Sequence, residues 1–389
     1  VEHPMLKAYQ YRIYPNQEQK ELLEKTFGCC RFVYNFCRAE QKKEEDRWTT
    51  VKEMQQQGYP LQDYKSKFFH KFDHVNAIKE LKQHYAFLKE VDSIALQSSV
   101  EHLATAYEKY YKKQGKKPRF KSKKRNDVTS YTTKCVNQNI EVMGNAIKLP
   151  KLKKVKAKIH RSFCGKIKKA TLSKTRTNKY YVSLTVETND VMPLEKTNQK
   201  VGVDLGLVDF VILSTGERIP NQRFLEKQHK KLEKAQQELS RKTIGSSNFI
   251  KVKRKIAKIH EKIAHQRKDY IHKITDYLVK AYDTICMEDL AVSEMKETDS
   301  AKRNLRVSDV GWYELKRELE YKCKWYGKRL SVIDRYYPSS QICARCGHRE
   351  GKKEVSIRRW ICPRCQANLD RDINASRNIL KEGLRILEI

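Results

Sequence analysis

The sequence predicts an α+β protein of several domains, and three features of the chain support this fold class. Helical periodicity covers residues 17–111, short strand patterns joined by turns cover residues 140–187, and strands alternate with helices from residue 201 onward. Alternating strands and helices are typical of an α/β domain, whereas separate runs of helices and strands indicate distinct domains. The length of 389 residues allows two or three such domains.

The N-terminal part is predicted to be a small β-barrel into which a helical bundle is inserted. Residues Lys7–Tyr14 alternate like a strand, and Pro15-Asn16 forms a turn behind them. Apolar residues then recur at helical spacing from Gln17 to about Tyr111, and Asp92-Ser93 offers an N-cap for the last helix. Because a lone strand needs partners, we place it with five strands predicted further along. These strands are Ile140–Val142, Ala146–Leu149, Ala157–His160, Ile167–Ser173 and Tyr180–Glu187.

The C-terminal part is predicted to be an α/β domain. Val201–Asp204 and Phe210–Leu213 flank a glycine-containing turn and form a hairpin that opens a mixed sheet. The helical stretch Phe224–Leu278 is interrupted at Gly245-Ser246-Ser247, so it should form two antiparallel helices. The further elements predicted are a strand at Asp283–Met287, a helix at Trp312–Gly327 and a strand at Leu330–Asp334.

The charge of the chain predicts a polyanionic partner. Lys and Arg number 82 against 47 Asp and Glu, a formal net charge of +35. Basic residues that only solvate a surface leave a protein within several charges of neutrality, so nucleic acid is the expected partner. No apolar run approaches the roughly 20 residues of a membrane span, and no N-terminal stretch resembles a secretory signal. With its 11 cysteines and no export signal, the chain is expected in a reducing compartment, with no membrane partner.

A run of cations broken by one glycine and one proline follows the predicted helical bundle, at Lys112–Arg125. Such a run is either a solvated linker or a loop that tracks phosphates, with Phe120 anchoring it to the body of the protein. The nucleic-acid-binding candidates in this loop are Lys116, Lys117, Arg119, Lys121, Lys123, Lys124 and Arg125.

Three carboxylates stand at strand ends or turns: Asp204, Glu288 and Asp372. Singly, each has an ordinary explanation: a turn-forming Asp, a solvated strand end and a helix cap. As a set in one α/β region of a basic protein, they match a site for hard divalent cations, because converging carboxylates repel one another unless cations are present. Phosphodiester hydrolysis uses two such ions, so the set predicts a nuclease dependent on Mg²⁺ or Mn²⁺.

Four cysteines have the spacing of a structural zinc site. Cys343, Cys346, Cys362 and Cys365 form a C-x2-C-x15-C-x2-C pattern, in which each pair makes a knuckle and the four thiolates complete a tetrahedron. His348 could replace one thiolate, although we expect it on the surface. The remaining cysteines have no paired spacing and are expected as small core residues: Cys29, Cys30, Cys37, Cys135, Cys164, Cys286 and Cys323.

Several long motifs match one known family. They are KAYQYRIYPNQEQ, CRFVYNF, DSIALQSSVEHLATAYEKYY followed by GKKPRFKSKKR, VGVDLGL, KRKIAKIHEKIAHQRKDYIHKIT, SDVGWYELKRELEYKCKWYG, YPSSQICARCG and DRDINASRNIL. On these motifs, which cover nearly the whole chain, it resembles TnpB, the RNA-guided DNA endonuclease family of IS200/IS605 transposons that is related to Cas12 effectors. The resemblance implies a β-barrel wedge domain with an inserted helical recognition domain, and an RNase H-like (RuvC) nuclease domain with a zinc-ribbon insertion. The implied bounds are 5–16 and 128–190 for the wedge domain, 17–127 for the recognition domain, 191–342 and 366–389 for the nuclease domain, and 343–365 for the zinc ribbon.

The resemblance also implies partners and site residues. The family binds a guide RNA (omega RNA) from the transposon end, with one protein expected per guide, and recognises a short motif beside its double-stranded target DNA. By position, Asp204, Glu288 and Asp372 match the nuclease carboxylates of the family. In the last segment the catalytic acid of the family stands two residues before an Asn, which selects Asp372 and not Asp370. Gln97 and Asn137 fall where the family contacts the motif-adjacent duplex.

Alternatives remain for the role of Arg371 and for the function of the whole chain. Arg371 either steadies the scissile phosphate or forms a structural ion pair. A compact Cas12f-like CRISPR effector would share the site, and the neighbouring genes would distinguish it. A guided, non-cleaving DNA-binding repressor would be expected to have lost at least one acid, and all three are present. A DNA-strand transposase would need a His-hydrophobe-His motif beside a Tyr, and the sequence has none.

Overall fold

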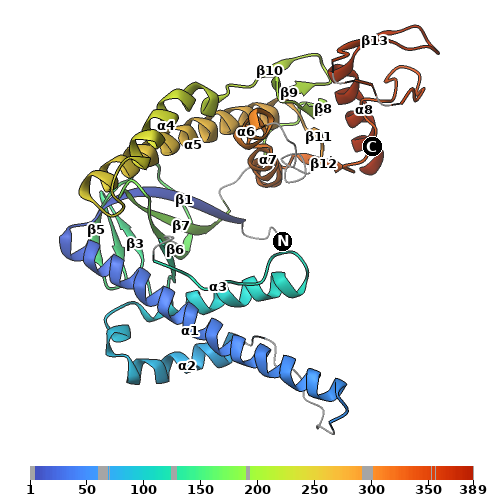
Figure 1. Cartoon of the computed structure of the whole chain (residues 1–389). Coiled ribbons are helices and arrows are strands. Elements are labelled where there is room, and N and C mark those ends of the chain that lie inside the picture. Colours follow the sequence, from blue (N-terminus) through green and yellow to red (C-terminus); the bar gives the residue numbers. More distant parts are fainter. Residues whose placement is uncertain are drawn as a thin grey trace. The chain divides into compact units, whose positions relative to one another are not determined.

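The computed structural model describes residues 5–59, 69, 71–123, 129–189, 193–290, 301–351, 353–354 and 356–388. The chain forms two compact units, Val1–Asp190 and Val191–Ile389 (Figure 1). Within the described part of the chain, no helix combines the length and the apolar composition needed to cross a bilayer.

The first unit combines helices with an antiparallel sheet. Its helical elements are α1 (Gln17–Gln56), α2 (Lys71–His84), the short 3-10 helix η1 (Ala86–Lys89) and α3 (Ser93–Tyr111). Its strands are β1 (Met5–Tyr14), β2 (Ser130–Lys134), β3 (Glu141–Met143), β4 (Ala146–Leu149), β5 (Lys153–Lys158), β6 (Lys166–Lys174) and β7 (Tyr180–Thr188).

The predicted barrel is an open sheet. The strand order is β2-β6-β7-β1-β5-β4-β3, and within the described residues β2 and β3 remain at its two edges, so the sheet is a half-barrel. The barrel architecture expected for this part of the chain is thus confirmed in the form of a half-barrel. The placement of the N-terminal strand was right, because β1 pairs antiparallel with β7 along most of its length and with β5 at its end.

The helices and the half-barrel share one hydrophobic core. The same cluster of buried side chains contains Leu23 and Val33 of α1, Leu96 of α3, and Val155 and Val182 of the sheet. Helix α1 begins with a capping box between Asn16 and Gln19, directly after the turn that ends β1. Helix α3 begins at the predicted cap, where the Asp92 carboxylate accepts a hydrogen bond from Ile94 N at 3.0 Å. The insertion is thus packed on the sheet through a common core.

The second unit is an α/β layer with a small cysteine-containing hairpin. Its strands are β8 (Lys200–Leu205), β9 (Asp209–Leu213), β10 (Arg218–Pro220), β11 (Thr284–Glu288), β12 (Arg329–Ile333), β13 (Arg359–Ile361) and β14 (Asn368–Asp370). Its helices are α4 (Phe224–Ser240), α5 (Ser247–Ala281), α6 (Ala301–Val310), α7 (Trp312–Tyr326) and α8 (Arg371–Ile386). The two helices predicted from the interrupted stretch are α4 and α5, which lie side by side (Figure 1).

The main sheet of this unit has the order β10-β9-β8-β11-β12. Strands β8, β11 and β12 are parallel, whereas β9 and β10 form antiparallel hairpins with their neighbours. Side chains alternate between the two faces of the sheet. Val203 and Met287 pack with α5 and α7, whereas Cys286 packs with Ile379 of α8 on the opposite face.

Gly202 permits the close approach of α8 to the sheet. A Cβ at this position would overlap the Ser376 carbonyl oxygen and would lie 2.8 Å from Leu380 N. Only glycine leaves room for the helix backbone here, which explains a glycine inside a central strand. The contact brings the start of α8 toward the end of β8.

The cysteines outside the zinc-type pattern follow the predicted burial with one exception. Five are buried and Cys135 is half-buried, whereas Cys164 is exposed. The expectation that Cys164 belongs to a core was wrong, because it lies in the turn between β5 and β6 and not on a strand.

Candidate active site

Asp204 and Glu288 reach the same end and the same face of the sheet. In the parallel pairing of β8 with β11, Val203 lies opposite Met287, and both pack toward α5 and α7. Since neighbouring side chains on a strand point to opposite faces, the next residues, Asp204 and Glu288, point toward the face covered by α8. Both strands end here, so the two carboxylates lie at the carboxyl edge of the parallel strands.

Asp372 comes to this site from the first turn of α8. The capping explanation for Asp372 was wrong, because the cap is Asp370, whose carboxylate accepts hydrogen bonds from Asp372 N and Ile373 N, each at 3.1 Å. Asp372 is therefore free of the capping role, and its half-buried side chain projects from a helix end that Asp370 holds in place.

The electrostatics of the three carboxylates favour a bound cation. Burial, together with the like charge of Asp372, raises the pKa of Asp204 to about 7. Burial raises the pKa of Glu288 to about 8, and the charges of Asp204 and Asp289 act in the same direction. Negative charge is costly at this point unless a positive charge is supplied.

Asp204 is close enough to Asp372 and to Glu288 for its charge to act on each of them. Among the described residues, the four cysteines are the one group of His, Cys, Asp and Glu side chains whose ligand atoms all lie within 4.8 Å of one another. The three acids do not form such a group, and the structure connects them through the charge of Asp204. Their hard oxygen donors suit divalent cations such as Mg²⁺ or Mn²⁺.

Two arginines that the sequence did not single out contact Asp372. Arg218 of β10 lies 3.4 Å from an Asp372 oxygen and also pairs with Asp209 at 2.8 Å and Asp370 at 2.7 Å. Arg358, just before β13, lies 3.3 Å from the other Asp372 oxygen. These cations partly neutralise the third carboxylate. No local pattern distinguishes them from the many other basic residues of the chain.

Arg371 contacts the segment that precedes β13, and its expected role at the scissile phosphate stays a prediction. Its guanidinium Nη1 donates a hydrogen bond of 2.6 Å to the Glu354 carbonyl oxygen. It thereby ties the start of α8 to the segment before β13, although its charge still lowers the pKa of Asp204.

The four predicted cysteines form a cluster that fits a structural zinc ion. Cys343 Sγ lies 3.7 Å from Cys365 Sγ, and Cys346 Sγ lies 3.7 Å from Cys362 Sγ. Four sulfurs at about 2.3 Å from a tetrahedral zinc stand roughly 3.8 Å apart, so the spacing matches. His348 lies outside this group, as expected.

The two knuckles have the same backbone geometry. Gly347 N donates to Cys343 O at 2.9 Å, and Gln366 N donates to Cys362 O at 2.9 Å. Both donors have positive φ angles, 76° for Gly347 and 55° for Gln366. The turn that Gly347 was expected to support is therefore present.

Two buried asparagines of α8 bind the start of this module. Asn374 accepts from Ala344 N at 2.8 Å and donates to Ile342 O at 2.7 Å. Asn378 donates to Ile342 O at 2.6 Å and to Ser339 O at 2.8 Å. The cysteine module is thus fixed to the helix that carries Asp372.

The basic loop after α3 is fastened to α1. Asn35 exchanges hydrogen bonds of 2.8 and 2.9 Å with the Lys121 backbone, and Arg38 donates to Pro118 O at 2.9 Å. Phe120 is 41% exposed and lies beside Arg38, so the anchoring comes mainly from these polar contacts. Lys116, Lys117, Arg119 and Lys123 are exposed, Lys121 is half-buried, and Lys124 and Arg125 lie outside the described residues.

Gln97 and Asn137 are both exposed residues of the first unit. Gln97 lies on α3, and Asn137 lies in the turn between β2 and β3 with a φ of 48°. Asn137 also lines a cavity of about 970 Å³ on the half-barrel. The positions of both residues are compatible with contacts to a large ligand.

Comparisons with known proteins agree with this arrangement. A family model described as a probable transposase (OrfB_IS605) matches residues 183–299, and a Cas12f1-like TNB domain model matches residues 312–379. A model described as a helix-turn-helix domain matches residues 5–46, where the structure has β1 and the first part of α1. A solved Cas12f1 chain, from a complex with sgRNA and target DNA, shares the fold with a TM-score of 0.52 at 13% identity and covers 97% of this chain and 99% of its own.

The fold is therefore that of Cas12f-like proteins. A Streptomyces pristinaespiralis protein named "Putative RNA-guided DNA endonuclease" is 35% identical over 97% of this chain and 89% of its own length. InsQ of Escherichia coli K12, which carries the same designation, is 31% identical over 98% of this chain and 93% of its own length. The chain belongs to the TnpB family.

Proposed function

We propose that this protein is an RNA-guided DNA endonuclease that binds a guide RNA, recognises a short motif beside its target and cuts DNA at the Asp204, Glu288 and Asp372 site. The observation that carries the proposal is the convergence of these acids at one end of one sheet. They come from separate strands and a helix far apart in the sequence, in a chain with a net charge of +35. The names of the relatives support the same activity.

The residues of the site suit divalent cations by chemistry and by charge. The half-buried carboxylates of Asp204 and Glu288, whose pKa values are raised, offer oxygen ligands whose repulsion a cation would relieve. When bound, Mg²⁺ or Mn²⁺ would supply charge stabilisation at the scissile phosphate and activation of water. Asp204, whose charge acts on both other acids, would hold the centre of the set, with Glu288 and Asp372 on either side.

We extend the proposal to the four cysteines, the basic loop after α3, Gln97 and Asn137. The four cysteines would hold one structural zinc, and this zinc would hold the module that Asn374 and Asn378 attach to α8. The exposed cations of the loop after α3 would bind nucleic-acid phosphates, and Gln97 and Asn137 would contact the duplex beside the target. One chain is expected to act with one guide RNA in the cytoplasm.

The RNA that copurifies with the protein tests this proposal. Full-length protein purified without nuclease treatment should retain one RNA class transcribed from the end of its own element, and sequencing identifies it. An RNA transcribed with a CRISPR array would instead support the Cas12f-like alternative. Random cellular RNA would contradict guided binding.

A further inference from the structure

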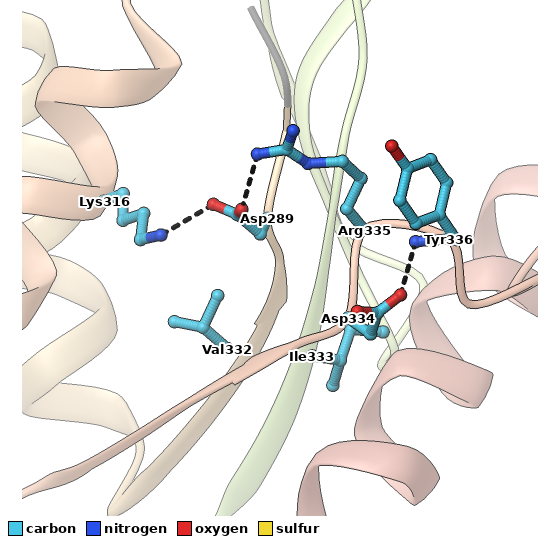
Figure 2. Close-up of a pocket in the computed structure, with 7 residues that line it drawn as sticks. All are labelled: Asp289, Lys316, Val332, Ile333, Asp334, Arg335 and Tyr336. Atoms are coloured by element: carbon cyan, nitrogen blue, oxygen red, sulfur yellow. Dashed lines mark hydrogen bonds and ion pairs between the residues drawn. The ribbon is translucent and has the colours of Figure 1, made fainter. Parts of the chain in front are cut away.

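A group of charged residues centred on Asp289 lies directly beside the second site carboxylate. Lys316 Nζ lies 2.7 Å from one Asp289 oxygen, and Arg335 Nη2 lies 2.9 Å from the other (Figure 2). We name Asp289, Lys316 and Arg335 the Asp289 clamp. Each carboxylate oxygen has its own cation, so two charge-assisted hydrogen bonds fix the orientation of this side chain.

The clamp joins three separate segments. Asp289 follows the last residue of β11, Lys316 belongs to α7, and Arg335 lies in the turn after β12. Asp289 N also donates to Ile333 O at 3.4 Å, which extends the contact between β11 and β12 beyond the strand end. The end of β11 is therefore held from both sides, by a helix and by the neighbouring strand.

Alternation along β11 connects the clamp to Glu288. Met287 packs toward α5 and α7, so Glu288 points to the α8 face and Asp289 returns to the α7 side, where Lys316 binds it. A rotation of the strand end that moved Asp289 off its cations would also turn Glu288 away from Asp204. The clamp thus opposes the motion that would most directly displace the second carboxylate.

The two cations of the clamp also compensate the negative charge of Asp289, which lies next to Glu288 in the chain. Hydrogen bonds from Lys316 and Arg335 hold the pKa of Asp289 below its usual range. The charge of Asp289 adds to the repulsion that Glu288 already feels from Asp204. Without the two cations, the segment would place two uncompensated carboxylates on adjacent residues at the edge of the site.

Cavities place the clamp next to the reaction site. A cavity of about 470 Å³ is lined by Glu288 together with all three clamp residues. A second cavity, of about 570 Å³, is lined by the clamp residues and by Tyr336 (Figure 2). The clamp residues and Glu288 therefore line one cavity.

We propose that the Asp289 clamp is a positioning device that sets the direction of Glu288 for binding of a divalent cation. This inference rests on the proposed nuclease function. The clamp residues act through Glu288, so they are positioning residues. Outer residues that orient a metal ligand typically affect metal affinity or activity by roughly 10–100-fold.

The test compares substitutions that keep or remove the clamp charges. Asp289→Asn and Arg335→Gln should each weaken Mn²⁺ binding by about 10-fold. Electron paramagnetic resonance on the guide-RNA complex measures this binding. The signal of Asp204→Asn is subtracted, so that Mn²⁺ bound elsewhere in the complex does not count. The Mg²⁺ concentration for half-maximal single-turnover cleavage should rise in parallel. Arg335→Lys, which keeps the cation, should recover most of the effect. Arg385→Gln, which breaks a surface pair with Glu382 on α8, is the matched control.

The outcomes separate positioning from general stability. The proposal is supported if Mn²⁺ affinity falls while the Tm and the Kd for target DNA remain those of the Arg385→Gln control. It is overturned if Mn²⁺ affinity and the Mg²⁺ dependence are unchanged, or if Arg335→Lys is as impaired as Arg335→Gln. If the unsubstituted complex itself fails to cut matched DNA, the proposed function fails; if it cuts normally and the variants do too, only the clamp inference fails.

Discussion

Asp204→Asn is expected to lower the rate of guided DNA cleavage at least about 1,000-fold, a loss of ~4 kcal/mol of transition-state stabilisation. Asp204 is the acid whose charge acts on both Asp372 and Glu288, so its substitution would remove the centre of the proposed cation site. Guide RNA and target DNA should bind as tightly as before, because asparagine keeps the size of the side chain and removes only its negative charge. Single-turnover cleavage and filter-binding assays on the same preparation measure both quantities.

The stability of this variant provides an internal check. Aspartate ionises near pH 3.9 in an unfolded chain, whereas burial and the charge of Asp372 raise the pKa of Asp204 in the folded protein to about 7. Ionisation therefore penalises the folded state increasingly as the pH rises from about 4 to 7, and asparagine removes this penalty. Without divalent cations at pH 8, the Tm of Asp204→Asn should equal or exceed that of the unsubstituted protein.

The control for this variant is Asp269→Asn, which removes a carboxylate from the exposed surface of α5. It should cleave normally and keep the original Tm. Full cleavage by Asp204→Asn, or loss of its DNA binding, would contradict the assignment of Asp204 as a site acid.

Cys362→Ser is expected to release the zinc and unfold the cysteine module. A structural zinc contributes an apparent folding free energy of roughly 10–16 kcal/mol in small zinc domains, so the module should not survive the loss of one ligand. The damage should extend to α8, because Asn374 and Asn378 would lose their partners at Ile342 and Ala344. Plasma mass spectrometry should find one zinc per chain before the substitution and almost none after it, with cleavage lost as well.

The matched control is Cys164→Ser, since Cys164 is exposed and lies outside the cluster. This variant should keep its zinc, its proteolytic stability and its activity. If Cys362→Ser retained one zinc per chain, the four-sulfur site would be refuted.

Patterns with a clear period predicted most of the fold correctly. The hairpin of β8 and β9, the pair α4 and α5, and the helix α7 were all expected close to where they lie. Each has a run of apolar residues at the spacing of one secondary structure, so local sequence was sufficient. The four cysteines were found for the same reason, because their chemistry is local and their spacing is specific.

Elements without such patterns were missed or misplaced. Strand β2 has the polar sequence SYTTK, yet Thr132 and Thr133 are buried in it. Strand β5 was placed too late in the sequence, because its lysines alternate with only two buried residues, Val155 and Ala157. Whether the first sheet closes depends on contacts between its edge strands, which no single strand encodes.

The assignment of the three acids to a catalytic site stays a prediction, and the contacts around them could not be predicted from the sequence. Asp204, Glu288 and Asp372 were recognised from strand ends and motifs, whereas the clamp on Asp289 and the contacts of Arg218 join residues far apart in the sequence. The sequence also allowed Asp372 to be the helix cap, because two aspartates stand two residues apart at one helix start. Only the backbone geometry shows which of the two accepts from the helix N–H groups.

The most direct test of guided cleavage exchanges the guide. The protein is reconstituted with one of two RNAs that differ only in the guide segment, and each complex is given both targets, with randomised sequence beside each target. In Mg²⁺, each complex should cut only the target that matches its own guide, and exchanging the guides should exchange the products. Cleavage of both targets with either guide, or of neither target at any flanking sequence, would contradict guided cleavage.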